Sequence, residues 1–98
     1  MQQVKFNKSM QQQYNYYKSK LETDPIHSLY KAYQKPSYYK VQAFNNCMRI
    51  VKEYNGFNFT ILGHNCQTFS FGFECTINNK LHFVWITPYN HRICCVEE

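Results

Sequence analysis

Three residues near the C-terminal end have side chains that could act together on a phosphodiester: Tyr89, His91 and Arg92. A histidine can move a proton near neutral pH, and an arginine can stabilise negative charge that develops on phosphate oxygens. The stretch Pro88-Tyr89-Asn90 is typical of a turn, so all three residues lie at or beside a hairpin. Acid–base cleavage of RNA is one hypothesis for them, and polar hairpin residues without a catalytic role are the other.

The segment INNKLHFVWIT, residues 77–87, precedes this trio. It looks like the penultimate hairpin of the messenger-RNA-cleaving toxins of bacterial toxin–antitoxin pairs, whose helical segment and four-stranded sheet are similar to the order expected here. The resemblance implies that basic residues, tyrosine and sometimes histidine act from the sheet. In this chain residues 57–98 contain two basic residues, Lys80 and Arg92, and three glutamates, so the half that forms the sheet is slightly acidic. A ribonuclease is therefore the alternative hypothesis, not the leading one.

Histidines and cysteines of the C-terminal half could be imagined as zinc ligands: His64, Cys66, Cys75, His82, His91 and Cys94. Structural zinc sites usually use pairs of ligands such as C-x₂-C, which this sequence lacks. Adjacent cysteines of a strand point to opposite faces, so Cys94 and Cys95 cannot easily bind the same ion. We therefore expect no metal and no cofactor. The cysteine count of five is odd and no export signal is visible, so we expect reduced thiols, most of them buried as small apolar side chains.

Positive charge gathers in residues 1–56, which hold nine of the eleven basic residues. Several tyrosines of this half do not fit an apolar stripe and stand beside lysines. Lysine and tyrosine together suit a phosphate backbone or a protein interface, whereas the scarcity of arginine argues against sequence-specific base reading. The alternative is a solvated basic face without a partner. The candidate binding residues are Lys5, Lys8, Lys18, Lys20, Lys31, Lys35, Tyr38, Tyr39, Lys40, Arg49 and Lys52.

The leading hypothesis is a small, non-enzymatic binding or inhibitor protein. Its expected partners are nucleic acid, a host nucleoprotein complex such as a defence effector, or an acidic protein surface, and no membrane. Abundant Lys, Asn, Tyr and Phe with little Ala indicate an AT-rich source such as a phage or mobile element, and hence the host cytoplasm. A homo-oligomer that pairs through a free sheet edge is a further alternative.

Helices are predicted in the first half, where apolar residues recur at helical steps. The first helix has the stripe Phe6, Met10, Tyr14, Tyr17 and Leu21 and ends near Leu21. A short second helix begins at Pro25, capped by Thr23 or Asp24, and ends before Pro36. The third is capped by Ser37 and ends at Asn55-Gly56, with Gly56 expected at positive φ. Its stripe is Val41, Phe44, Met48 and Val51, widened by Cys47, Ile50 and Tyr54.

Strands are predicted after Gly56, where the apolar period changes to two. In TFSFGFECTI, residues 68–77, apolar side chains alternate with small or polar ones. Phe71-Gly72-Phe73 resembles the centre of the base-stacking strand of RNA-recognition motifs and cold-shock domains, although the flanking residues differ from that pattern. Five apolar positions in strict alternation favour a core strand instead, with the Gly72 side towards solvent or a partner. Asn78-Asn79 is expected to form a tight hairpin turn.

Together these elements predict an α+β fold in one domain of residues 1–98. About three N-terminal helices, in the basic segment 1–56, should pack on one face of a four-stranded antiparallel β-meander formed by residues 57–98. The third strand, near residues 81–87, is apolar on both faces and should lie inside the sheet.

Overall fold

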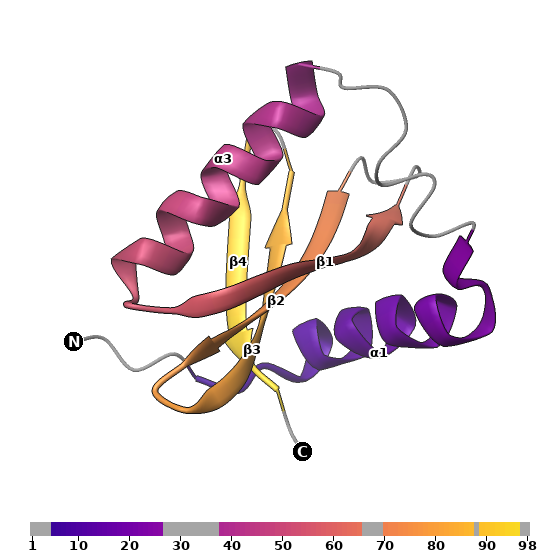
Figure 1. Ribbon diagram of the computed structural model, residues 1–98. Helices are drawn as coiled ribbons and strands as arrows, with labels where there is room; N and C mark the ends of the chain where they lie inside the picture. Colours follow the sequence, from indigo (N-terminus) through magenta and orange to yellow (C-terminus); the bar gives the residue numbers. More distant parts are fainter. Residues whose placement is uncertain (1–4, 27–37, 66–69, 88, 97–98) are drawn as a thin grey trace.

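The computed structural model describes residues 5–26, 38–65, 70–87 and 89–96. Within these ranges, two helices precede four strands (Figure 1): α1 (Lys8–Thr23), α3 (Tyr38–Glu53), β1 (Phe57–Asn65), β2 (Ser70–Ile77), β3 (Lys80–Ile86) and β4 (His91–Cys95). The α+β arrangement is confirmed, with two helices where about three were predicted. Pro25 and Ile26 are helical, and the rest of the predicted second helix lies outside the described residues.

The four-stranded antiparallel sheet is confirmed, and its strand order is β1-β2-β3-β4, with β3 inside it. Asn78 and Asn79 join β2 to β3 with φ of 53° and 62°, the left-handed conformation that tight hairpins require. At the outer side of β4, Phe6 forms a parallel bridge with Cys95. The segment before α1 therefore lies against the last strand of the sheet.

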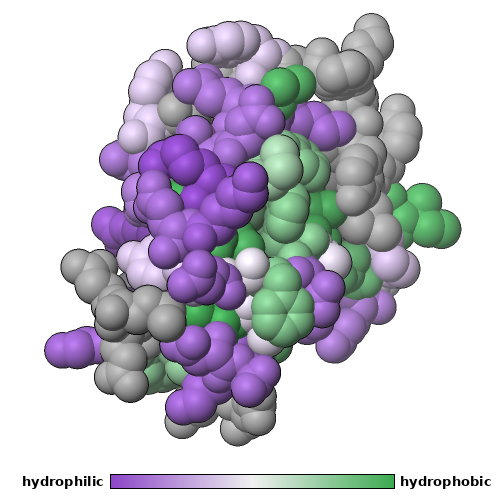
Figure 2. All heavy atoms as spheres, turned by 60° about the vertical axis from the view of Figure 1, so that its left-hand side comes forward, coloured by the Kyte–Doolittle hydropathy of each residue, from purple (hydrophilic) through white to green (hydrophobic). Residues whose placement is uncertain are grey.

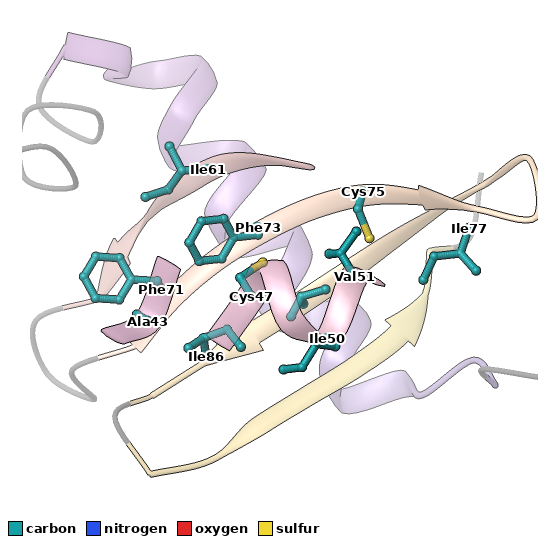
Figure 3. Packing of buried hydrophobic residues seen from close by; sticks show 11 residues of the cluster. Ala43, Cys47, Ile50, Val51, Ile61, Phe71, Phe73, Cys75, Ile77 and Ile86 are labelled. Atoms are coloured by element: carbon teal, nitrogen blue, oxygen red, sulfur yellow. The ribbon is translucent and has the colours of Figure 1, made fainter. Parts of the chain in front are cut away.

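The odd-numbered residues of β2 form the core beneath α3. Phe71, Phe73, Cys75 and Ile77 are all buried, and they pack with Ala43, Cys47, Ile50 and Val51 of α3 (Figure 3). The ring of Phe44 stands edge-on to Phe73, with 5.1 Å between ring centroids. Each buried phenylalanine contributes about 1.5–3 kcal/mol of transfer free energy. The prediction that this strand belongs to the core, and is not a base-stacking platform, is confirmed.

The even-numbered residues of β2 face α1 on the other side of the sheet. The Tyr17 hydroxyl lies 2.9 Å from Ser70 Oγ, and the Tyr17 ring lies directly over Gly72. The prediction that all helices share one face, with the Gly72 side towards solvent or a partner, was wrong, because α1 of the same chain covers that side. Small side chains at Ser70 and Gly72 make room for an aromatic ring, so this side of the strand is also a packing surface.

α3 is rotated about its axis relative to the predicted stripe. Val41 and Met48 are 50% and 44% exposed, whereas Ala43, Cys47 and Ile50 are fully buried. Apolar residues cover about half of this helix, so its periodicity did not define the centre of the buried face. Ala43 belongs to the core cluster that also contains Phe71 and Phe73 of β2.

The helix ends have identifiable caps. Asn7 Oδ1 accepts a hydrogen bond from the Met10 amide at 3.0 Å and caps α1. At the end of α3, Asn55 has a positive φ of 56°. The amide of Gly56 then donates a hydrogen bond to Val51 O at 2.7 Å, which caps the helix. Positive φ at Gly56 was therefore a wrong prediction. A Cβ at Gly56 would lie 2.9 Å from an Ile77 side-chain atom, so glycine serves close packing there.

The four described cysteines are free, and Cys47, Cys75 and Cys94 are buried while Cys95 is half-buried. Burial raises the pKa of Cys47 from 9.0 to about 12, with a further contribution from Cys75. Burial likewise raises the pKa of Cys75 and of Cys94 from 9.0 to about 11. Because the thiolate is the reactive species, these three thiols should react slowly in the folded protein.

A Cys66→Ser variant tests this arrangement of thiols. At pH 8 a pKa near 11 leaves about 100-fold less thiolate than an ordinary cysteine has. In the native variant an alkylating reagent should therefore modify the half-buried Cys95 first, and the three buried thiols more slowly. Mass spectrometry after timed labelling measures the rates, and labelling in urea is the control. Equal native rates for all four thiols would contradict the buried core.

Candidate nucleic-acid interface

α1 and the residues just before it form a basic segment. Residues 5–21 contain four lysines and no acidic residue. We call Lys5, Lys8, Lys18 and Lys20 the α1 basic surface. Lys5, Lys8 and Lys20 are exposed to solvent. These three ammonium groups can attract an anionic partner without first breaking a buried contact.

Lys18 has a structural neighbour on the sheet. Its Nζ lies 3.7 Å from Glu74 Oε2 and 5.9 Å from the centroid of the Tyr14 ring. The Tyr14 hydroxyl donates to the same carboxylate oxygen at 3.1 Å. Burial, followed by the charge of Glu74, raises the pKa of Tyr14, so the hydroxyl stays protonated as a donor. This cluster anchors one flank of α1 to β2 and leaves the other flank open.

The open flank of α1 carries a pocket. Gln12, Gln13 and Tyr16 line it together with Asn65 from the end of β1, and its volume is about 260 Å³. We call it the Tyr16 pocket. Tyr16 is 47% exposed, and Lys20 Nζ lies 5.9 Å from the centroid of its ring. The pocket thus combines an aromatic ring, three side-chain amides and an adjacent positive charge.

Sequence reasoning missed most of this pocket. Gln12 and Gln13 belong to a short glutamine run, and Asn65 is distant in the sequence. The available signal was Tyr16, which stands outside the apolar stripe and close to lysines. Its position four residues after Gln12 and four before Lys20 places all three on one side of a helix.

The predicted basic set is divided between opposite faces of the sheet. Lys40, Arg49 and Lys52 lie on α3, and Arg49 pairs with Glu53 at 3.0 Å. Tyr38 is exposed on the same helix, as are Val41 and Met48. Figure 2 shows hydrophilic side chains over much of the side that it brings forward, with a band of hydrophobic ones exposed among them. Lys31, Lys35 and the side chain of Tyr39 lie outside the described residues.

The alternative catalytic trio does not converge on one face of the sheet. His91 pairs with Ile86, a residue of the core beneath α3, whereas Arg92 pairs with Trp85 on the α1 side. The Arg92 guanidinium lies 5.9 Å from the Trp85 ring centroid. Adjacent strand residues point to opposite faces, so His91 and Arg92 leave β4 on opposite sides of the sheet. The exposed Tyr89 lies in the turn before them.

Among residues 5–26, 38–65, 70–87 and 89–96, no group of three or more His, Cys, Asp or Glu side chains is arranged to hold a metal ion. Neither described helix is long and apolar enough to span a bilayer.

Comparisons with protein-family models, with curated proteins and with solved structures gave no match. Function is therefore inferred from the geometry of the chain itself.

Proposed function

We propose that this protein binds nucleic acid without cleaving it, through the α1 basic surface. The observation that carries the proposal is the charge of one segment: residues 5–21 hold four lysines and no acid, and the first acidic residue of α1 is Glu22 in its last turn. The same helix exposes Tyr16 beside a pocket. Lysines supply sequence-independent attraction to phosphates, and an exposed aromatic ring supplies contact with bases.

The contacts available on α1 favour backbone recognition over sequence reading. Lysine binds phosphate as a point charge, and residues 5–26 contain no arginine that could form a two-pronged contact with guanine. Such a protein acts by covering nucleic acid. By doing so it would inhibit a host nucleic-acid-processing complex in the cytoplasm, as expected for a small phage or mobile-element protein.

Fluorescence anisotropy with labelled single-stranded RNA and duplex DNA tests the proposal across a salt series. If four lysines engage phosphates, the slope of log affinity against log salt should be about −3 for a single strand. Poly-glutamate of similar charge is the control, because it carries charge without bases or phosphates and should compete poorly. Absence of binding at 50 mM salt would contradict the proposal and favour an acidic protein surface as the partner. Light scattering in the same buffers measures the mass and so tests the homo-oligomer alternative.

A further inference from the structure

The Tyr16 pocket has the size and the chemistry of a site for one small aromatic ring. Its volume of about 260 Å³ is below the ~300–1,000 Å³ typical of pockets for drug-sized ligands. Tyr16 offers a ring for stacking, and the edge-on contact with Tyr17, at 5.8 Å and 78°, orients it. The anchored Tyr17 therefore limits how far the Tyr16 ring can turn away.

The polar lining of the pocket suits the edges of nucleobases. Gln12 and Gln13 each present an exposed side-chain amide with two N–H donors and a carbonyl acceptor, and Asn65 completes the polar lining. Purines and pyrimidines all expose donors and acceptors on their edges when unpaired, so these amides can satisfy any base without selecting one strongly. Asn65 comes from the sheet and the glutamines from the helix, so the base would be held between two elements.

Lys20 places a positive charge where the phosphate of the same nucleotide would lie. Its Nζ is 5.9 Å from the centroid of the Tyr16 ring, and the lysine is exposed. A base stacked on Tyr16 brings its own backbone close to this ammonium group. Stacking on an aromatic side chain combined with a lysine for the backbone is the general mode of single-strand binding.

We infer that the Tyr16 pocket accepts one unpaired nucleobase, so that the protein prefers single-stranded over double-stranded nucleic acid. This inference rests on the proposed function. In a duplex the bases are stacked and paired, and one could enter the pocket only by flipping out, which is unfavourable by a few kcal/mol. The α1 basic surface alone, without the pocket, would bind duplex and single strand through phosphates with little distinction.

The test compares three labelled ligands of equal length: a single strand, its duplex, and an abasic strand that keeps the phosphates. Tyr16→Ala should weaken single-strand binding about 5- to 150-fold, since one stacked base contributes ~1–3 kcal/mol. Binding to the duplex and to the abasic strand should change less than twofold. Tyr16→Phe is the matched control, because it keeps the ring and should retain most of the affinity. Melting temperatures of all variants show whether each one folds.

The outcomes separate the inference from the proposed function. If Tyr16→Ala leaves single-strand binding unchanged, or weakens all three ligands equally, the base pocket is wrong while phosphate binding by α1 stands. If the wild-type protein binds the abasic strand as tightly as the normal strand, the base pocket is also wrong. If the wild type binds none of the ligands at low salt, the proposed function itself fails.

Discussion

Gly72→Val should lower the free energy of unfolding by about 3 kcal/mol, at the upper end of overpacking effects in protein cores. A Cβ at Gly72 would lie 2.9 Å from Cδ2 of Tyr17 and 3.1 Å from Cε1 of Phe83. Valine adds two further carbons at the same point. The Tyr17 hydroxyl is tied to Ser70, so the ring cannot move aside without losing a buried hydrogen bond. The valine therefore separates α1 from the sheet.

Urea unfolding and thermal melting measure this effect. A domain of this size loses about 4–8 °C of melting temperature per kcal/mol, so a decrease of more than about 10 °C is expected. Thr76→Val is the matched control, because Thr76 is half-buried on the same strand and points to the same side as Gly72. It should change the melting temperature little. A Gly72→Val protein as stable as the wild type would contradict the close contact between α1 and β2.

Charge reversal at Lys5, Lys8 and Lys20 should have the largest effect on binding. Each reversal removes one attraction to phosphate and adds one repulsion. The loss of binding free energy should be on the order of 1 kcal/mol for each reversed residue, because all three are exposed. The triple variant should therefore bind about 100-fold more weakly. The salt slope should become less steep by about 2, which corresponds to three phosphate contacts with a single strand. The three side chains are exposed, so the fold should remain intact.

The matched control reverses Lys40, Arg49 and Lys52 on α3. This variant has the same net charge, but its reversed charges lie on the opposite side of the sheet. At 0.15 M salt the screening length is about 8 Å, so charges across the sheet should affect binding little. Anisotropy titrations of both variants against the same strand decide the question. Equal losses of affinity in the two variants would show that the net charge of the protein, and not the α1 basic surface, governs binding.

Local patterns in the sequence predicted the elements well. Steps of three and four placed Met10, Tyr14 and Tyr17 on the buried face of α1, and alternation placed Phe71 and Phe73 in the core. The hairpin at Asn78-Asn79 was also correct, because asparagine adopts positive φ readily. These features depend on neighbouring residues and on backbone geometry, which a single sequence contains.

The arrangement of the helices could not be read from the same patterns. Ser70 and Gly72 look like solvent-facing positions in a list of residues, yet their small size is what accommodates Tyr17. The division of the basic residues between two faces follows from that packing. The Tyr16 pocket also depends on it, because Asn65 reaches α1 only when the helix lies across this side of the sheet. Such long-range placement has no periodic signal.

The contacts of α1 impose an order on folding during synthesis. Tyr14 bonds to Glu74, 60 positions later in the chain, and Phe6 pairs with Cys95. At roughly 5–20 residues per second, the ribosome takes about 3–12 s to make the residues between Tyr14 and Glu74. During that interval the apolar face of α1 has no sheet to cover it, because β2 is completed only at Ile77 and β3 follows it. α1 should therefore dock late, and the nascent helix is the segment that a chaperone would meet first.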